Sequence, residues 1–521
     1  MAKSTSTMVR HALFMMAGTL ASRVLGLVRE IVTAAWFGAS GVLDAFNVAF
    51  TLANLARQLL AEGALSASFV PVFTRVLGDR GLREAENLAR QAFTVLLAAT
   101  GIALAAGVFF SPLLVGIMAP GFDPVKAQLA VSLTKWMFPF LMFVSLAALA
   151  MGVLNSMGSF LVPALAPALS NLVYIIIVLF LASSWEVWGL VLAVLTGGLC
   201  QFALQWGWTG RLGITLLPGR PDFGNPDLRK MLSLFLPYAA GLSLNQVNPV
   251  ISRMLASFLH EGSISVLNYA NRIIQLPLGL FVIAVSQAVL PQLSRCPYDR
   301  VDEFRETMAE SLRFALFIVL PVTLGMMLLS REIVHLLFYR GAFGDWAWGG
   351  TSVSLAMYSA GLPGMACSTV VMRGLYARSL PREALRVTLT SVAATALFSL
   401  ALMKPLGFGG LALATSLSFS LSGWVGIRLL SANLGLRLGA VSLSWALKMG
   451  VSLLATAAGA LLYNWLWSYP AEVGLLFRSA WISGIFLASC AIYGSATAAL
   501  RFQEWRWLRD AFFRKKRRSE Q

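Results

Sequence analysis

Charged residues are scarce in this 521-residue sequence, in which only 12% of the residues are Asp, Glu, Lys or Arg. Soluble domains carry about 25% charged residues and about 45–50% apolar ones. Here 58% of the residues are hydrophobic, and the mean hydropathy is +0.75. This composition excludes a soluble globular protein, a disordered chain and a dedicated nucleic-acid-binding protein.

Histidine and cysteine are also rare, with three and four residues. The histidines form no cluster. The cysteines lie far apart, without the spacing of a metal or redox site, at Cys200, Cys296, Cys367 and Cys490. A membrane glycosyl- or phosphotransferase would need acids or histidines gathered in its loops. We therefore predict no metal site, no catalytic residue and no enzymatic activity.

Long hydrophobic segments are abundant instead. A transmembrane helix needs about 20 mostly apolar residues, and the hydropathy pattern predicts 14 of them. They cover 11–37, 45–74, 91–115, 127–154, 161–182, 188–209, 231–259, 264–294, 314–330, 349–377, 387–403, 408–427, 443–466 and 479–500. Since Arg23 and Arg29 interrupt the first apolar stretch, we interpret it as an uncleaved helix and not as a signal peptide. The expected fold class is an all-α polytopic membrane protein.

The positions of the basic residues predict the orientation of these helices. If the N-terminus is cytoplasmic, 27 of the 40 Lys and Arg residues fall on the inner side and only 5 in outer loops. Both termini are then cytoplasmic, and the basic tail, 501–521, is expected to lie near anionic lipid. The alternative for this tail is a nucleic-acid-binding patch. Tryptophan pairs such as Trp185 and Trp188 border the outer loops, which is typical of an interfacial aromatic belt.

A short internal repeat suggests two related lobes. Pro71 and Arg75 end the second predicted helix, and Pro291 and Arg295 end the eighth, so that both residues recur with the same offset along the chain. We therefore expect an N-lobe of six helices at 1–220, a C-lobe of six helices at 221–437, and two additional helices within 438–500. One short match in an apolar chain can also arise by chance. Two lobes around a midplane site are typical of transporters that work by alternating access.

Eight basic residues fall inside the predicted helices, and four of them lie far from the helix ends: Arg23, Arg29, Arg57 and Arg272. Arg253, six residues from a helix end, could face either the cavity or the interface. An arginine at the centre of a lipid-facing helix costs about 2.5–3.5 kcal/mol on insertion scales. We therefore expect the four arginines to line a hydrated central cavity.

Few acids are available to neutralise these arginines, namely Glu30, Asp44 and Glu62. Four cations against three acids leave a net positive interior, which favours an anion site, and the guanidinium fork matches phosphate oxygens. The alternative is that all four arginines are held in structural ion pairs. Arg23 and Arg29 are about 240° apart around an ideal helix. Both could reach one ligand only if the helix bends, for example at Gly26, or if the cavity is wide.

The same residues carry a resemblance to a known family. The segments Ser22–Glu30, Phe37–Ala39 and Asp44–Phe46 resemble the first-helix signature of the MurJ (MviN) lipid II flippases. The resemblance continues in Asn54–Arg57, Ala61–Ala64, Phe69–Pro71, Tyr269–Arg272 with Pro277, and Arg340–Phe343. It extends from residue 10 to about residue 440 and agrees with the number of predicted helices.

The resemblance implies a 14-helix flippase of the bacterial cytoplasmic (inner) membrane, in the multidrug/oligosaccharidyl-lipid/polysaccharide exporter superfamily. Such proteins move lipid II, the undecaprenyl-diphosphate-linked peptidoglycan precursor, to the outer leaflet for cell-wall synthesis. It also implies that the four arginines bind the diphosphate headgroup, and that a gating or supporting role falls to Ser22, Gly26, Glu30, Asp44, Glu62 and Asn271. The two additional helices would form a groove for the lipid tail. Expected partners are lipid II, membrane lipids and cell-wall synthesis proteins, and no nucleic acid.

The sequence departs from the family pattern at two sites. Asn271 and Gln275 stand where some relatives have acids, so less counter-charge is expected beside Arg272. Some relatives also bind sodium through acids in their seventh and eleventh helices, but 231–259 and 387–403 contain no Asp or Glu. We expect no cofactor, and coupling either to the membrane potential or to a monovalent cation.

The residues by themselves leave alternative functions open. One alternative is an exporter of another polyprenyl-linked oligosaccharide or of drugs in the same superfamily. A drug exporter should depend on acids in an apolar cavity, whereas cations prevail here. A scaffold for cell-wall proteins would leave the arginines within the membrane unexplained.

Overall fold

The computed structural model describes residues 2–58, 63–243, 246–296, 299–434, 442–505 and 507. Within these ranges the regular elements are helices, with no strand. In chain order they are α1 (Ala2–Phe37), α2 (Gly41–Arg57), α3 (Gly63–Arg80), α4 (Leu82–Phe109), α5 (Ser111–Met118), α6 (Pro124–Met137), α7 (Pro139–Ser156), α8 (Leu161–Arg211), α9 (Pro226–Ser243), α10 (Val247–Ala256), α11 (Ser263–Pro277), the π-helix η3 (Leu278–Ile283), α12 (Ala284–Arg295), α13 (Val301–Leu328), α14 (Ser330–Phe338), α15 (Asp345–Ser359), α16 (Leu362–Ala377), α17 (Pro381–Leu434), α18 (Leu443–Leu466) and α19 (Leu475–Ala499).

Within the described ranges, each apolar segment of the sequence falls on one or more of these helices, and two segments share a single helix in α8 and again in α17. By length and composition, eight helical segments of the described ranges can cross a membrane, or nine if the bent pair α15–α16 forms one span. The all-helical, polytopic fold is therefore confirmed. The count of 14 spans stays a prediction.

The two longest helices, α8 and α17, are each a hairpin of two arms. At 51 and 54 residues they are more than twice as long as the roughly 20 residues that one crossing needs. Each contains one residue with non-helical dihedral angles, Glu186 in α8 and Gly407 in α17. In α8 the arms lie against each other, because a Cβ added to Gly197 would be 2.8 Å from the carbonyl oxygen of Ser170.

By its internal contacts the chain divides into two compact units. The first comprises Met1–Ser265 with Arg340–Phe343. In this unit α1 packs along α8, α7 packs against α8, and α3 packs against α7 and α9. A buried cluster from α3, α4, α7 and α9 fills its core and includes Phe69, Phe73, Leu88, Leu149 and Met231. Helices α9 and α10, which open the predicted C-lobe, thus group with the first unit by contact.

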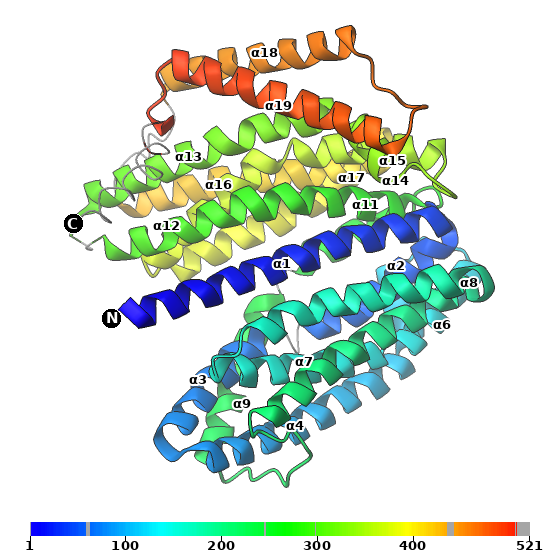
Figure 1. Cartoon of the computed structure of the whole chain (residues 1–521), viewed down its shortest axis with the longest axis vertical. Helices are drawn as coiled ribbons and strands as arrows, with labels where there is room; N and C mark the ends of the chain where they lie inside the picture. Colours follow the sequence, from blue (N-terminus) through cyan, green and yellow to red (C-terminus); the bar gives the residue numbers. More distant parts are fainter. Residues whose placement is uncertain are drawn as a thin grey trace. The chain divides into compact units, whose positions relative to one another are not determined.

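The second unit comprises Val266–Tyr339 and Gly344–Gln521. Here α16 packs along α17 at very short range, since a Cβ on Gly361 or Gly364 would lie within 2.5 Å of the hydroxyl of Ser416 or Ser420. Small residues at such a contact let the helix backbones approach closely. Helices α18 and α19 run side by side (Figure 1), and α18 contacts α13.

The helix boundaries repeat along the chain. Helix α13 starts as far after α4 as α17 starts after α8, to within one residue, and this offset is that of Pro291 from Pro71. The hairpin breaks at Glu186 and Gly407 have nearly the same offset. The repeat seen in the sequence therefore recurs in the secondary structure. The predicted lobe boundaries stay predictions, and most of the basic tail lies outside the described residues.

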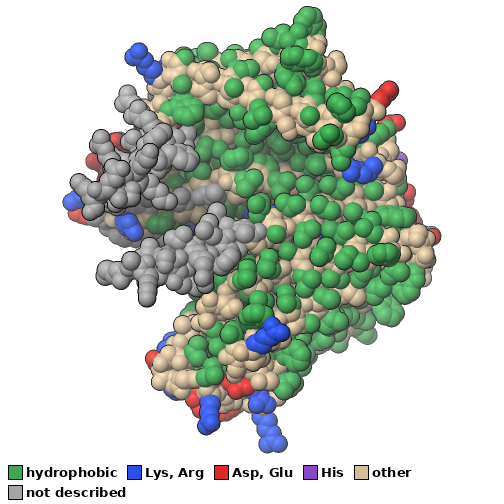
Figure 2. All heavy atoms as spheres, viewed as in Figure 1, with side chains coloured by type: hydrophobic (Ala, Val, Ile, Leu, Met, Phe, Trp, Pro, Cys, Tyr) green, Lys and Arg blue, Asp and Glu red, His purple; other side chains and the backbone are tan. Residues whose placement is uncertain are grey.

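Large hydrophobic side chains cover much of the surface. Phe109, Phe180, Leu397 and Leu476 are each at least 68% exposed, and Figure 2 shows hydrophobic side chains spread over the face in view. A water-soluble monomer rarely exposes contiguous apolar patches beyond a few hundred Å². These surfaces are suited to contact with lipid, so the chain is a multi-pass membrane protein.

An aromatic cluster in the second unit joins α14 to the segment between α18 and α19. His335 is 4% exposed, and its Nδ1 atom is 3.1 Å from the Tyr469 hydroxyl. The rings of Tyr339 and Trp348 also pack against the imidazole. Burial and the positive charge of Arg478 lower the pKa of His335. The folded protein therefore favours the neutral imidazole.

We predict that this junction makes stability fall in mild acid. Because the folded pKa of His335 lies below the unfolded value of about 6.5, its contribution is complete above that pH and is lost as the pH falls towards the folded pKa. Thermal unfolding between pH 7.5 and pH 5 should show a steeper decrease for the parent than for His335→Phe. The exposed His260 provides the control, and a His260→Gln variant as flat as His335→Phe would contradict this assignment.

Candidate functional site

Arg29 is held between two aromatic rings of the first unit. Its guanidinium lies 5.6 Å from the ring centre of Phe50 on α2 and 5.1 Å from that of Tyr174 on α8. Its Nη2 atom donates to Glu30 Oε1 at 2.8 Å. Each cation–π contact contributes about 0.5–1 kcal/mol when exposed and about 2 kcal/mol when desolvated. Arg29 is thus oriented by the rings and already neutralised by one acid.

Thr33 connects the backbone of Arg29 to the same tyrosine. Its hydroxyl donates to the carbonyl oxygen of Arg29 at 2.9 Å and lies 3.1 Å from the buried Tyr174 hydroxyl. The Arg29 side chain keeps 20% of its surface exposed. Its direction is set from α2 and α8, and the protein does not cover it completely.

The other predicted arginines lie in partly buried positions. Arg57, at the end of α2, donates through Nε to Asn54 Oδ1 at 2.8 Å. Arg23 is half-buried on α1. Arg272 is half-buried on α11 and belongs to the second unit, as does the half-buried Asn271. The structure thus places Arg23, Arg29 and Arg57 in one unit, and a cavity shared with Arg272 stays a prediction.

Helix α1 is one continuous helix from Ala2 to Phe37, and Gly26 is buried within it. The helix assignment has no break at Gly26, and the expected bend there stays a prediction. On an ideal helix Arg23 and Arg29 are about 240° apart around the axis. One ligand could contact both only with a bend in α1 or in a wide cavity. Ser22 contributes its carbonyl oxygen, which accepts from Asn171 Nδ2 of α8 at 3.2 Å.

Asp44 binds the start of another helix. Its Oδ1 atom accepts from the backbone N–H of Ser265 at 2.8 Å and from the Ser265 hydroxyl at 2.7 Å. Its Oδ2 atom accepts from the Gly262 N–H at 2.8 Å and from Lys126 Nζ at 3.3 Å. Asn47, one turn along α2, donates to the same serine hydroxyl at 3.1 Å. Asp44 is only 2% exposed, and both of its oxygens are fully engaged.

This arrangement corrects one expectation about the interior charge. Asp44 is paired with Lys126 and with the N-terminus of α11, where unpaired N–H groups and the helix dipole favour an anion. It is not the counter-ion of the arginines within the predicted spans. Of the three predicted acids, Glu30 alone is seen paired with one of these arginines, and Glu62 lies outside the described residues.

The turn at Gly38, which follows α1, packs against the turn at Gly341. The N–H of Ala342 donates to the carbonyl oxygen of Ala35 at 2.8 Å. Gly38 and Gly341 both have positive φ, at 58° and 59°. A Cβ on Gly38 would lie 2.4 Å from the Ala342 oxygen, and one on Gly341 would lie 2.2 Å from the Ala35 oxygen. Only glycine fits at either position, so the end of α1 is locked to residues 340–343.

Another buried acid of the first unit lies at its basic end, where α3 ends and α9 begins. The Asp227 carboxylate accepts hydrogen bonds there from Arg75 and Arg80. Asp227, at the start of α9, is 3% exposed, and both arginines come from the end of α3. These ion pairs connect α3 to α9, two helices that lie far apart in the sequence.

Several of these residues are missed by sequence reasoning. Tyr174, Thr33 and Phe50 occupy ordinary apolar helical positions, and the hydropathy pattern places Lys126 in an outer loop. No spacing in the sequence pairs Lys126 with Asp44, because they lie on α6 and α2 and meet only through helix packing.

We predict that Asp44→Asn strongly destabilises the protein. An amide keeps one accepting oxygen but turns two N–H donors towards groups that also donate. Breaking a buried ion pair in this way costs about 3–5 kcal/mol, which thermal unfolding in detergent should detect. The control is Asp123→Ala, which removes the N-cap of α6 and should cost only about 1 kcal/mol. An equal decrease for both variants would rule out a special role for the Asp44 cluster.

Comparisons with known proteins agree with this architecture. The family model described as lipid II flippase MurJ matches residues 33–482. A "Probable lipid II flippase MurJ" of Rhizobium meliloti is 34% identical over 429 residues, covering 80% of this chain and 78% of the relative. The "Lipid II flippase MurJ" of Burkholderia cenocepacia is 31% identical, covering 76% of this chain and 78% of the relative.

Solved structures show the same fold. A lipid II flippase MurJ in an inward closed conformation superposes with a TM-score of 0.78 at 24% identity, covering 94% of this chain and 98% of that one. An inward-facing multidrug transporter of the MATE family superposes with a TM-score of 0.66 at 16% identity, covering 83% of this chain and 99% of that one. With the family model matched over most of its length, the chain belongs to the MurJ family of lipid II flippases.

Proposed function

We propose that this chain flips lipid II from the inner to the outer leaflet of a bacterial cytoplasmic membrane, for cell-wall synthesis. Family membership over residues 33–482 carries this proposal. Half-buried arginines on α1 and α2 support it, because a diphosphate headgroup needs cations and hydrogen-bond donors away from bulk water. The chain is a transporter in this proposal, and no bond is made or broken.

The proposed first step is an exchange of counter-ions at Arg29. A diphosphate oxygen takes the place of the Glu30 carboxylate, while the rings of Phe50 and Tyr174 keep the guanidinium in position. Arg23 and Arg57, and Arg272 on α11, are the further proposed headgroup-binding residues. The polyprenyl tail stays in the lipid, and the pair α18–α19 is the proposed groove for it.

The proposed second step opens the outer side. Asp44 and the Gly38–Gly341 turns hold this side of the first unit together. Outward opening requires the donors at the start of α11 and on Lys126 to leave the Asp44 carboxylate. We therefore assign Asp44 a gating role, with Asn47 and Ser265 as its partners, and a supporting role to Ser22, Gly26 and Asn271.

The proposed topology has 14 spans with both termini in the cytoplasm, because the basic residues gather on that side. A membrane potential that is negative inside favours the return of the empty cationic site, at about 2.3 kcal/mol per charge per 100 mV. Voltage is therefore the proposed driving force. Cell-wall synthesis proteins that consume the flipped lipid are the proposed partners.

Another polyprenyl-diphosphate oligosaccharide would engage the same guanidinium groups. The binding assay below therefore includes a polyprenyl diphosphate that carries a different sugar. Binding of that lipid as tight as binding of lipid II would favour the broader exporter function.

We predict that Arg57→Ala weakens lipid II binding by the purified protein about tenfold to hundredfold, because a hydrogen bond to a charged group contributes about 1.5–3 kcal/mol. Arg57→Lys should lie between the parent and the alanine variant, since lysine keeps the charge but loses the donor fork. The same order is expected for growth of cells that depend on this chain, measured at equal protein levels.

The control is Arg229→Ala, which removes an exposed arginine at the basic end. This variant should bind lipid II and support growth like the parent. If Arg57→Ala, Arg29→Ala and Arg272→Ala all did the same, the proposed anion site would be refuted.

A further inference from the structure

A pocket of about 640 Å³ lies on the first unit, beside the turn of the α8 hairpin and away from the arginines. It is lined by residues of α6 and of both arms of α8: Trp136, Ser184, Trp185, Glu186, Trp188, Val191, Leu192 and Leu195. The tryptophans are partly exposed, at 65% for Trp136, 53% for Trp185 and 38% for Trp188. A shallow pocket with so many indoles on a membrane protein is suited to an amphipathic ligand.

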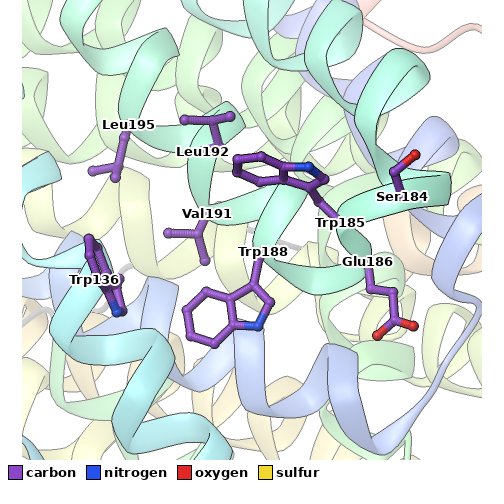
Figure 3. Close-up of a pocket in the computed structure, with 8 residues that line it drawn as sticks. All are labelled: Trp136, Ser184, Trp185, Glu186, Trp188, Val191, Leu192 and Leu195. Carbon is purple, nitrogen blue, oxygen red and sulfur yellow. The ribbon is translucent and has the colours of Figure 1, made fainter.

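The lining residues are ordered by polarity. Figure 3 shows Ser184 and Glu186 together at one end of the pocket, the rings of Trp185 and Trp188 next to them, and Leu195 and Trp136 towards the other end. A phospholipid has the same order, from a polar headgroup through the interface to an apolar chain. Tryptophan prefers the depth of the membrane interface.

The backbone at Glu186 is strained. Its φ of 46° and ψ of −132° are close to the first central position of a type II′ turn, at about +60° and −120°, where glycine dominates. The corresponding turn of α17 has nearly the same angles, φ 56° and ψ −133°, and has Gly407 there. The two hairpins thus turn with the same backbone conformation. The first has glutamate at the position where the second has glycine, the residue that this conformation favours. Such strain is tolerated when the side chain contributes something else.

The Glu186 carboxylate forms no ion pair with the residues that the structure describes, and its side chain is exposed at the pocket end. An acid beside indole faces is the arrangement that recognises an ammonium group, since both the carboxylate and the ring faces attract a cation. The polar end of the pocket is therefore suited to a positively charged headgroup.

We propose that this pocket binds one phospholipid with an ammonium headgroup. The ammonium lies against Glu186 and the indoles of Trp185 and Trp188, and an acyl chain follows Leu192 and Leu195. In the proposed topology the lipid belongs to the outer leaflet. An anionic lipid is disfavoured at this site because its headgroup would face the Glu186 carboxylate.

The test measures the first bound lipid on the purified full chain by native mass spectrometry. Three lipids with matched acyl chains are titrated: phosphatidylethanolamine, its N-acetylated form, which keeps the phosphate charge but lacks the ammonium group, and phosphatidylglycerol, which is also anionic. Phosphatidylethanolamine should bind most tightly. Glu186→Gln should weaken its binding about tenfold, because the ion pair is lost while the indole faces remain, and should reduce its advantage over the two lipids that lack an ammonium group.

Two controls are matched to the pocket. Glu472→Gln removes an exposed acid from another loop, and Trp424→Ala removes an exposed tryptophan of α17, outside the pocket. Both should leave phosphatidylethanolamine binding unchanged, whereas Trp188→Ala should weaken it. Lipid binding is measured without transport, so its outcome is independent of lipid II flipping.

Glu186→Gly separates this role from a purely structural one. The variant relieves the backbone strain, so its unfolding temperature in lipid-free detergent should rise while its phosphatidylethanolamine binding falls. Unchanged binding in Glu186→Gly or in Glu186→Gln, or equal binding of the three lipids by the parent, would overturn the proposal.

Discussion

The carboxylate of Asp44 is the interaction that joins the start of α2 to α6 and to the start of α11 in the first unit. In a chain with so few acids, one buried carboxylate accepts four hydrogen bonds, from Lys126 and from the residues that begin α11. Removing any partner would leave a charge buried without compensation, which is far more costly than never burying it. The cluster therefore holds α2, α6 and the start of α11 together for as long as all its partners stay in place.

Arg29 is held by contacts of a different kind from those of Asp44. Its counter-ion is the neighbouring Glu30, and its orientation comes from two aromatic rings and not from a dense set of acceptors. Such a guanidinium can exchange one anion for another without leaving its place. A residue held by rings is suited to binding and releasing a headgroup, whereas a residue held like Asp44 is suited to keeping a structure closed until several contacts change together.

The internal repeat shows how one backbone can serve different chemistry. The hairpins α8 and α17 turn at corresponding residues with almost equal dihedral angles, yet one turn contains Glu186 and the other Gly407. The two turns occupy corresponding positions of the internal repeat. The carboxylate is found only at the first of these turns, together with the tryptophans that line its pocket.

Sequence alone determined the helical, polytopic class, the approximate helix positions and the internal repeat, because hydropathy and helix length follow directly from the thickness of a bilayer. It also singled out Arg29, since a charge within an apolar segment is conspicuous wherever it points, and Asp44, as one of the few acids near such a segment. The partners of these charges were decided by tertiary structure. Lys126, Tyr174 and Ser265 all lie far along the chain from the groups they contact, and no local pattern encodes which faces of distant helices meet. The packing of α1 along α8 is likewise a tertiary contact that the sequence pattern does not specify.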